Sequence, residues 1–193
     1  MVPVDGATFG LSNTTNISIT AFSPIHQILF DPDASPFTIT VLPDQLLEFS
    51  AEVGGITNNS DVRQNFVLTA DSSGQSGNCV FFGGTISGPV LFTNEGSMIA
   101  GGNPASVSFQ LDSGSGDATF HNLGAGGQTD FSYTSSAGES TLISYGGAVA
   151  GARGGERSFS FNTPTAGDAT LIAYGGTNGG DERPGWKCSG TVI

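Results

Sequence analysis

Apolar and polar positions alternate in short runs along most of the chain, and this period of two indicates β-strands with one buried face. In the stretch DATLIAY (168–174), Leu171 and the alanines on either side of it share one face. The stretch SFSF (158–161) alternates in the same way and predicts that Phe159 and Phe161 share a face. Glycine, β-branched and aromatic residues outnumber good helix formers, so the pattern predicts an all-β protein.

A unit with the same landmarks occurs four times from residue 81 onward. The landmarks are an aromatic residue, a Gly seven or eight positions later, a Phe or Leu, and a second Gly four positions further on. The four copies are Phe81, Gly88, Phe92 and Gly96; Phe109, Gly116, Phe120 and Gly124; Phe131, Gly138, Leu142 and Gly146; and Phe159, Gly167, Leu171 and Gly175. A turn separates the two strands of each unit, and its Gly supplies the positive φ that the corner needs.

The spacing of the units predicts a parallel β-solenoid. The first aromatic recurs after 28, 22 and 28 residues, which suits one coil of such a fold. Equivalent residues then stack about 4.8 Å apart, so that Leu171 lies over Leu142, which lies over Phe120 and then Phe92. The triplets MIA (98–100) and AVA (148–150) are candidates for a third short strand.

Less regular strand patterns precede these units and are interpreted as earlier coils. We expect one domain over residues 1–193, a single right-handed parallel β-helix of about seven turns. Residues 1–16 are expected to form a cap or a frayed segment, residues 17–176 the solenoid turns, and residues 177–193 a C-terminal cap or tail.

The succession ILFDPDASPFTITV, GGITNNSDVRQNFVL and the AG-D/E-A/S-T-L units resembles the repeat regions of secreted bacterial β-helix surface proteins, among them autotransporter passengers. The resemblance covers roughly residues 25–176. It implies a right-handed parallel β-helix displayed outside the cell as a stalk or an adhesive surface.

Charge and composition exclude some classes of function. The formal net charge is -12 and only 5 residues are Lys or Arg, which excludes an electrostatic nucleic-acid interface. No apolar run is long enough for a membrane span. The start, MVPVDGATFG, lacks signal-peptide features, so either the protein stays inside the cell or its targeting segment lies outside this sequence. The low Lys content and the richness in Gly, Ser, Thr and Asn favour the second, and we expect an exported protein.

An acidic column is the most conspicuous candidate for chemistry. Asp117, Glu139 and Asp168 each follow the Gly of a repeat, and all are expected to point outward. A solvated outer face is the favoured interpretation; weak calcium binding and acid/base chemistry on sugars are the alternatives. Pro89 occupies the equivalent position of the first repeat.

Other outward positions offer surfaces of a different kind. Thr119, Thr141 and Thr170 form a threonine column, for which β-propensity is the simplest explanation and ice binding an alternative. The aromatic residues that could form a sugar-stacking platform are Tyr133, Tyr145, Tyr174 and Trp186. Stacking of Tyr174 on Tyr145 is the simpler explanation for the repeat tyrosines.

The nucleophilic and metal-binding residue types are sparse. His26 and His121 are separated in the chain and no G-x-S-x-G motif is present, so no hydrolase triad is predicted. Cys79 takes the place of Val107 in the next repeat and is expected to be a small buried hydrophobe, while Cys188 lies in the tail. No catalytic or cofactor-binding residue is assigned.

The expected function is that of a non-enzymatic, extracellular structural or adhesive module of a bacterial surface or secreted protein. A polysaccharide-binding or polysaccharide-cleaving β-helix protein is one alternative, and a subunit of a self-assembling filament is the other. The expected partners are surface glycans or further copies of the chain.

Overall fold

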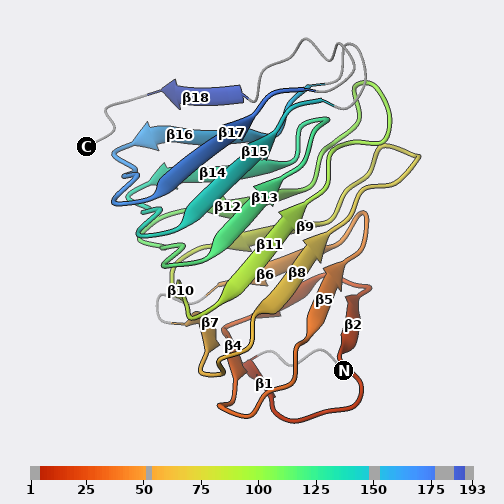
Figure 1. The fold of residues 1–193 in the computed structure, drawn as a ribbon, viewed down its shortest axis with the longest axis vertical. Helices are drawn as coiled ribbons and strands as arrows, with labels where there is room; N and C mark the ends of the chain where they lie inside the picture. The colour runs from red at the N-terminus through yellow and green to blue at the C-terminus, as the bar shows by residue number, and fades with distance from the viewer. Residues whose placement is uncertain (1–4, 51–53, 148–152, 177–184, 190–193) are drawn as a thin grey trace.

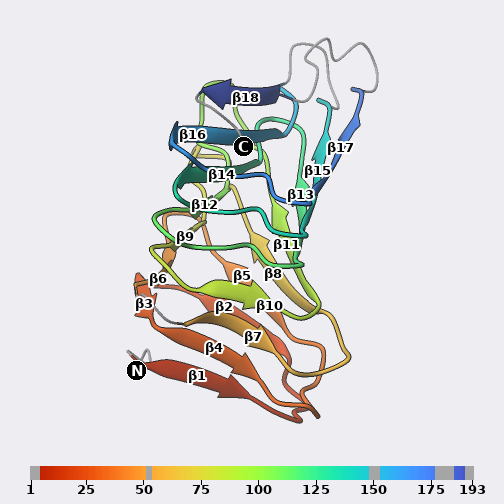
Figure 2. The ribbon, with the colours of Figure 1, turned by 90° about the vertical axis from the view of Figure 1, so that its left-hand side faces the viewer.

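The protein is built from stacked β-strands. The structure is a computed structural model that describes residues 5–50, 54–147, 153–176 and 185–189. Within these ranges it has eighteen strands and no helix. Consecutive strands along the chain pass from one side of the molecule to the next, and every strand pairs in parallel with the equivalent strand of the neighbouring coil, as Figures 1 and 2 show.

The strands form three parallel sheets along the long axis of the molecule. Sheet A contains β1 (Gly6–Phe9), β4 (Gln27–Phe30), β7 (Gly55–Asn58) and β10 (Thr85–Ser87). Sheet B contains β2 (Asn16–Ile19), β5 (Thr38–Val41), β8 (Gln64–Leu68), β11 (Val90–Asn94), β13 (Thr119–Asn122), β15 (Thr141–Tyr145) and β17 (Thr170–Tyr174). Sheet C contains β3 (Ser23–Ile25), β6 (Leu46–Phe49), β9 (Asn78–Phe81), β12 (Ser106–Phe109), β14 (Gln128–Tyr133), β16 (Glu156–Asn162) and β18 (Gly185–Ser189).

The predicted β-solenoid and its register are confirmed. In sheet B, Phe92 pairs with Phe120, which pairs with Leu142 and then Leu171. The first aromatics of the repeats are likewise aligned in sheet C. The right-handed winding and the count of about seven turns remain predictions from the sequence.

The third side of the solenoid differs from the expectation. Residues 98–100 form an exposed bend in the loop after β11 and are not a strand, and residues 148–150 lie outside the described residues. The third side is instead sheet A, which narrows after β10 to single bridges at Gly114, Ser136 and Thr165. These bridges fall within the segments that the sequence assigned to turns.

The regular stacking also extends beyond the predicted limits of the solenoid. Strand β1 pairs with β4, so sheet A begins within the segment 1–16. Strand β18 pairs with β16, so sheet C continues into the segment 177–193.

Two ladders of phenylalanine rings fill the interior. From Phe49 to Phe159, successive rings behind sheet C stack with centroids 4.4, 4.7, 5.0 and 5.0 Å apart. Behind sheet B, Phe66, Phe92 and Phe120 stack at 4.8 and 5.3 Å. The ladders meet edge to face, because Phe109 lies 5.7 Å from Phe120 at an angle of 87°. Both geometries are favourable for aromatic rings.

Glycine is required where sheet A turns into sheet B. Gly116 and Gly138 have φ values of 56° and 57°, in the left-handed region that favours glycine. A Cβ atom on Gly116 would lie 1.9 Å from the carbonyl oxygen of Ile86 in the coil below. Glycine therefore recurs at this position for two reasons: it tolerates the left-handed backbone, and the close approach of the neighbouring coil leaves no room for a Cβ atom.

Polar side chains replace apolar ones at the interior corner between sheets B and C in the later coils. Asn94 donates to the Oδ1 of Asn122 at 2.8 Å, and Asn122 donates to the carbonyl of Glu156 at 2.8 Å. Above them, Arg157 donates through Nη1 to the Oγ of Ser144 at 2.8 Å. Burial lowers the pKa of Arg157 from its ordinary value. Asn94 and Arg157 also donate to backbone carbonyls, of Gln128 at 2.8 Å and of Ile172 at 3.2 Å, and these bonds hold the shape of the corner.

Truncation of one ladder ring tests the contribution of the stack to stability. Phe109 is 0 % exposed and packs between Phe81 and Phe131. We expect Phe109→Ala to lower the free energy of unfolding by about 3–5 kcal/mol, because it leaves a cavity inside a continuous stack. The control is Phe22→Ala at a 55 % exposed position, which should change stability by less than about 0.5 kcal/mol in the same denaturant titration. Equal effects of the two substitutions would contradict the ladder as the source of stability.

Candidate ligand-binding face

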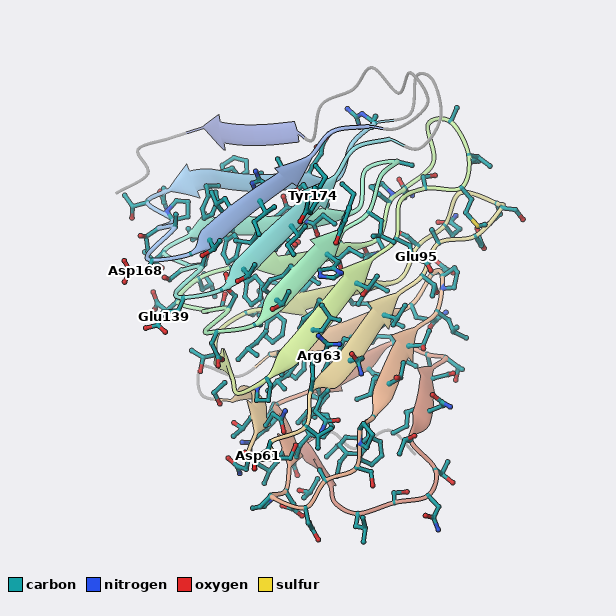
Figure 3. The ribbon with its side chains drawn as sticks, in the orientation of Figure 1. Asp61, Arg63, Glu95, Glu139, Asp168 and Tyr174 are labelled. Carbon is teal, nitrogen blue, oxygen red and sulfur yellow. The ribbon has the colours of Figure 1, made fainter. Side chains whose placement is uncertain are left out.

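The acidic column lies where the sequence placed it. Asp117, Glu139 and Asp168 are exposed, and Figure 3 shows Glu139 and Asp168 at the edge of the molecule. Their backbones are in register, since Glu139 donates to Gly116 and Asp168 to Gly138, each at 2.8 Å. Among the described residues, no group of three or more His, Cys, Asp or Glu side chains is arranged to hold a metal ion.

The outer face of sheet B carries the threonine column. Thr119, Thr141 and Thr170 are paired in register on adjacent strands. At the other end of the same strands the rings of Tyr145 and Tyr174 stack at 5.3 Å, which confirms the expected stacking of like on like. None of these threonines and tyrosines lines either of the two recesses described below.

Of the two histidines, His121 lies on this same face. Its ring contacts Tyr145 edge to face at 5.6 Å. Partial burial and then the positive charge of Arg63 lower the pKa of His121 from its ordinary value. His121 is therefore a neutral side chain in a polar and aromatic surface at neutral pH.

Cys79 is confirmed as a small buried residue. It is 0 % exposed, pairs with Val107 in sheet C, and its thiol is free. Burial raises the pKa of this thiol well above its ordinary value, which keeps it protonated and unreactive. The side chain of Cys188 lies outside the described residues.

The outer face of sheet C carries a recess that the sequence did not predict. The recess has a volume of about 460 Å³ and lies between the outer face and the loops that lead into sheet C. Its polar lining consists mainly of amides and hydroxyls: Asp44, Gln45, Gln75, Ser76, Asn78, Asn103, Ser106 and Gln128. Two of them are already held in place, because Ser106 donates to the Oδ1 of Asn78 at 2.9 Å.

A second recess of about 380 Å³ continues along the same face, and Gln128 lines both. Its lining consists of Ser108, Gln110, Gln128, Asp130, Ser132, Tyr133, Ser158, Ser160 and Phe161. Asp130 is the organising residue, because it accepts from Gln128 Nε2 at 2.7 Å and from the Oγ of Ser158. We call the two recesses together the sheet C groove.

Phe161 is the clearest departure from the sequence expectation. The alternation SFSF placed Phe161 inside with Phe159, but Phe159 is 1 % exposed and Phe161 is 73 % exposed. The reason is a bulge between β14 and β16: Ser132 pairs with Ser160 and Tyr133 with Asn162, which leaves Phe161 as the extra residue. Both Phe161 and Asn162 adopt a left-handed backbone, with φ of 59° and 55°.

The repeat Gly and the positions around it, which are the most regular part of the sequence pattern, do not line the groove. A signal was present in the repeats. Asn78, Ser106 and Gln128 all stand three positions before the first aromatic of their coil, and sheet C pairs them in register. The loops that give the groove its depth have no common pattern and could not be placed from the sequence.

No family model, curated protein or solved structure matches this chain. The parallel β-solenoid is the part of the predicted resemblance that the structure supports. None of the described residues forms a helix that is long and apolar enough to cross a membrane.

Neutralisation of the acidic column tests its solvated-face interpretation. We expect the triple variant Asp117→Asn, Glu139→Gln, Asp168→Asn to melt at a higher temperature than the wild type at low salt, because like charges in equivalent turns of adjacent coils repel. The difference should vanish near 1 M salt, where the screening length falls to about 3 Å. Calorimetry with calcium and with chelator supplies the control. A calcium-dependent rise in Tm of the wild type alone would contradict the interpretation.

Proposed function

We propose that this protein is a non-enzymatic, extracellular structural and adhesive module whose sheet C groove binds a glycan. The single observation that carries the proposal is the lining of the groove. Amide and hydroxyl side chains both donate and accept hydrogen bonds, as sugar hydroxyls do, and they occupy consecutive coils of one rigid sheet.

The charge of the groove supports a neutral glycan. Asp44 and Asp130 are the charged side chains among the residues lining the groove, and the whole chain has a formal net charge of -12. An anionic polysaccharide would be repelled over the whole approach to this surface. A neutral chain of sugars meets no such barrier.

The arrangement of the carboxylates favours binding over cleavage. Asp130 is engaged by Gln128 and Ser158. Asp44 lines the first recess and Asp130 the second, so neither recess has a pair of carboxylates among its lining residues. Glycoside hydrolysis requires two carboxyl groups that flank one bond. The proposed export is supported by the low content of Lys and Arg and by the resemblance described above.

A glycan array tests the proposed function. The wild type should retain neutral oligosaccharides without releasing products detectable by mass spectrometry. Gln128→Ala should weaken retention about 5–10-fold, because this side chain lines both recesses. Thr170→Ala, at an exposed position on sheet B, is the matched control and should bind as the wild type does.

Three results would count against this function. Cleaved products would identify an enzyme. Equal losses of glycan retention in Gln128→Ala and Thr170→Ala would show that the glycan does not bind specifically to sheet C. No retention of any glycan on the array, together with a particle mass that increases with protein concentration, would favour self-assembly. The first coil supports that second candidate, because Phe9 in the edge strand β1 and Ile17 and Ile19 in the edge strand β2 are only partly buried.

A further inference from the structure

Two exposed aromatic side chains lie at one end of the sheet C groove. Tyr133 is 42 % exposed and Phe161 is 73 % exposed, and both line the second recess. They belong to strands β14 and β16, which are neighbours in sheet C. The sequence pointed to Tyr133 as a sugar-stacking residue, but its companions there, Tyr145 and Tyr174, lie on sheet B.

The backbone that holds these two rings outward is strained. Tyr133 and Phe161 have φ values of 61° and 59°, a region that aromatic residues rarely adopt. Continued alternation after Phe159 would have buried Phe161, and the bulge prevents this. Bulges commonly re-aim a side chain beside a functional site, and local strain of this kind concentrates at ligand-binding positions.

The polar groups beside the rings complete a site for a sugar. Ser132 and Ser160 line the same recess directly before the two aromatics in the chain, and Asp130 lies on the same strand as Tyr133. A pyranose ring with equatorial substituents has an apolar face of C–H groups and a rim of hydroxyls. The rings of Tyr133 and Phe161 suit the face, and Asp130 with the serine hydroxyls suits the rim.

We propose that Tyr133 and Phe161 form an aromatic subsite that stacks on one pyranose ring of a neutral, β-linked glycan lying in the sheet C groove. The proposal rests on the proposed function and names its ligand class and specificity-determining residues. β-Linked chains of equatorial sugars are extended and present repeated apolar faces, which matches a groove that runs across consecutive strands. No Lys or Arg lines the described recess, so the subsite does not select for acidic sugars.

Titration calorimetry with defined hexasaccharides tests the subsite. The probes are β-1,4-linked glucose and β-1,4-linked xylose, with α-1,4-linked galacturonic acid as the anionic comparison. Wild type should bind the neutral probes and not the anionic one. Phe161→Ala and Tyr133→Ala should each weaken that binding at least tenfold, and Tyr133→Phe should retain it because the ring remains. Phe22→Ala removes an exposed Phe elsewhere and should bind as the wild type does.

Thermal unfolding separates a binding role from a structural one. Phe161→Gly relieves the left-handed backbone, so its Tm should equal or exceed that of the wild type while its glycan affinity falls. A lowered Tm with unchanged affinity would show that Phe161 serves the fold and would overturn the proposal.

The remaining outcomes distinguish the subsite from the proposed function. If the wild type binds the neutral probes and Phe161→Ala binds them equally well, the subsite is wrong and the groove stands. If the wild type binds none of the probes but retains another neutral glycan on the array, the β-linked subsite is wrong and the proposed function is retained; if it binds no glycan in either experiment, both are wrong. If Phe161→Ala instead lowers the mass measured by light scattering, the two rings form a contact between copies of the chain, which also overturns the subsite.

Discussion

Each coil lies directly on the next, residue over residue, and hydrogen bonds between parallel strands set the distance at about 4.8 Å. The ring of Phe109 is held between Phe81 and Phe131 at 4.7 and 5.0 Å by this stacking. A side chain's place within its coil therefore decides whether it joins the core or an exposed column. The same constraint aligns the phenylalanine ladder on the inner face of sheet C and Asn78, Ser106 and Gln128 on its outer face. The core and the groove are therefore formed by opposite faces of the same in-register strands.

The columns through Phe81 and Phe92 could be predicted because a repeated environment selects a repeated residue, and a fixed spacing makes the repeat visible. Phe161 could not be placed, because a bulge shifts the register by one residue and turns an inward position outward. The narrowing of sheet A to single bridges was equally hidden, since the chain there is only a turn between better-defined strands. The first recess of the groove depends on the loops before β6, β9 and β12, whose sequences share no pattern. Only the strand residues at the floor of the groove could therefore be predicted from the repeats.

A surface built on this scaffold has properties that suit adhesion. The groove's floor is part of a hydrogen-bonded sheet, and its polar side chains already bond to one another, as Ser106 does with Asn78 and Gln128 with Asp130. Little conformational freedom is then lost when a ligand binds. The acidic surface and the lining without Lys or Arg would repel an anionic polymer, and the exposed ring of Phe161 would offer an apolar contact to a bound sugar at one end. The free energy that the stack supplies is what allows this local strain to persist.

A crystal structure of the protein with a neutral β-1,4-linked glucose hexasaccharide would test the central claim most directly. The claim is that in-register stacking presents a rigid, preformed groove on sheet C. The account predicts that the sugar lies across Gln128, with one ring against Phe161 and Tyr133, and that the backbone of the coils is unchanged. Sugar bound instead on sheet B against Tyr145 and Tyr174, or a groove that forms only after the coils change register, would contradict it.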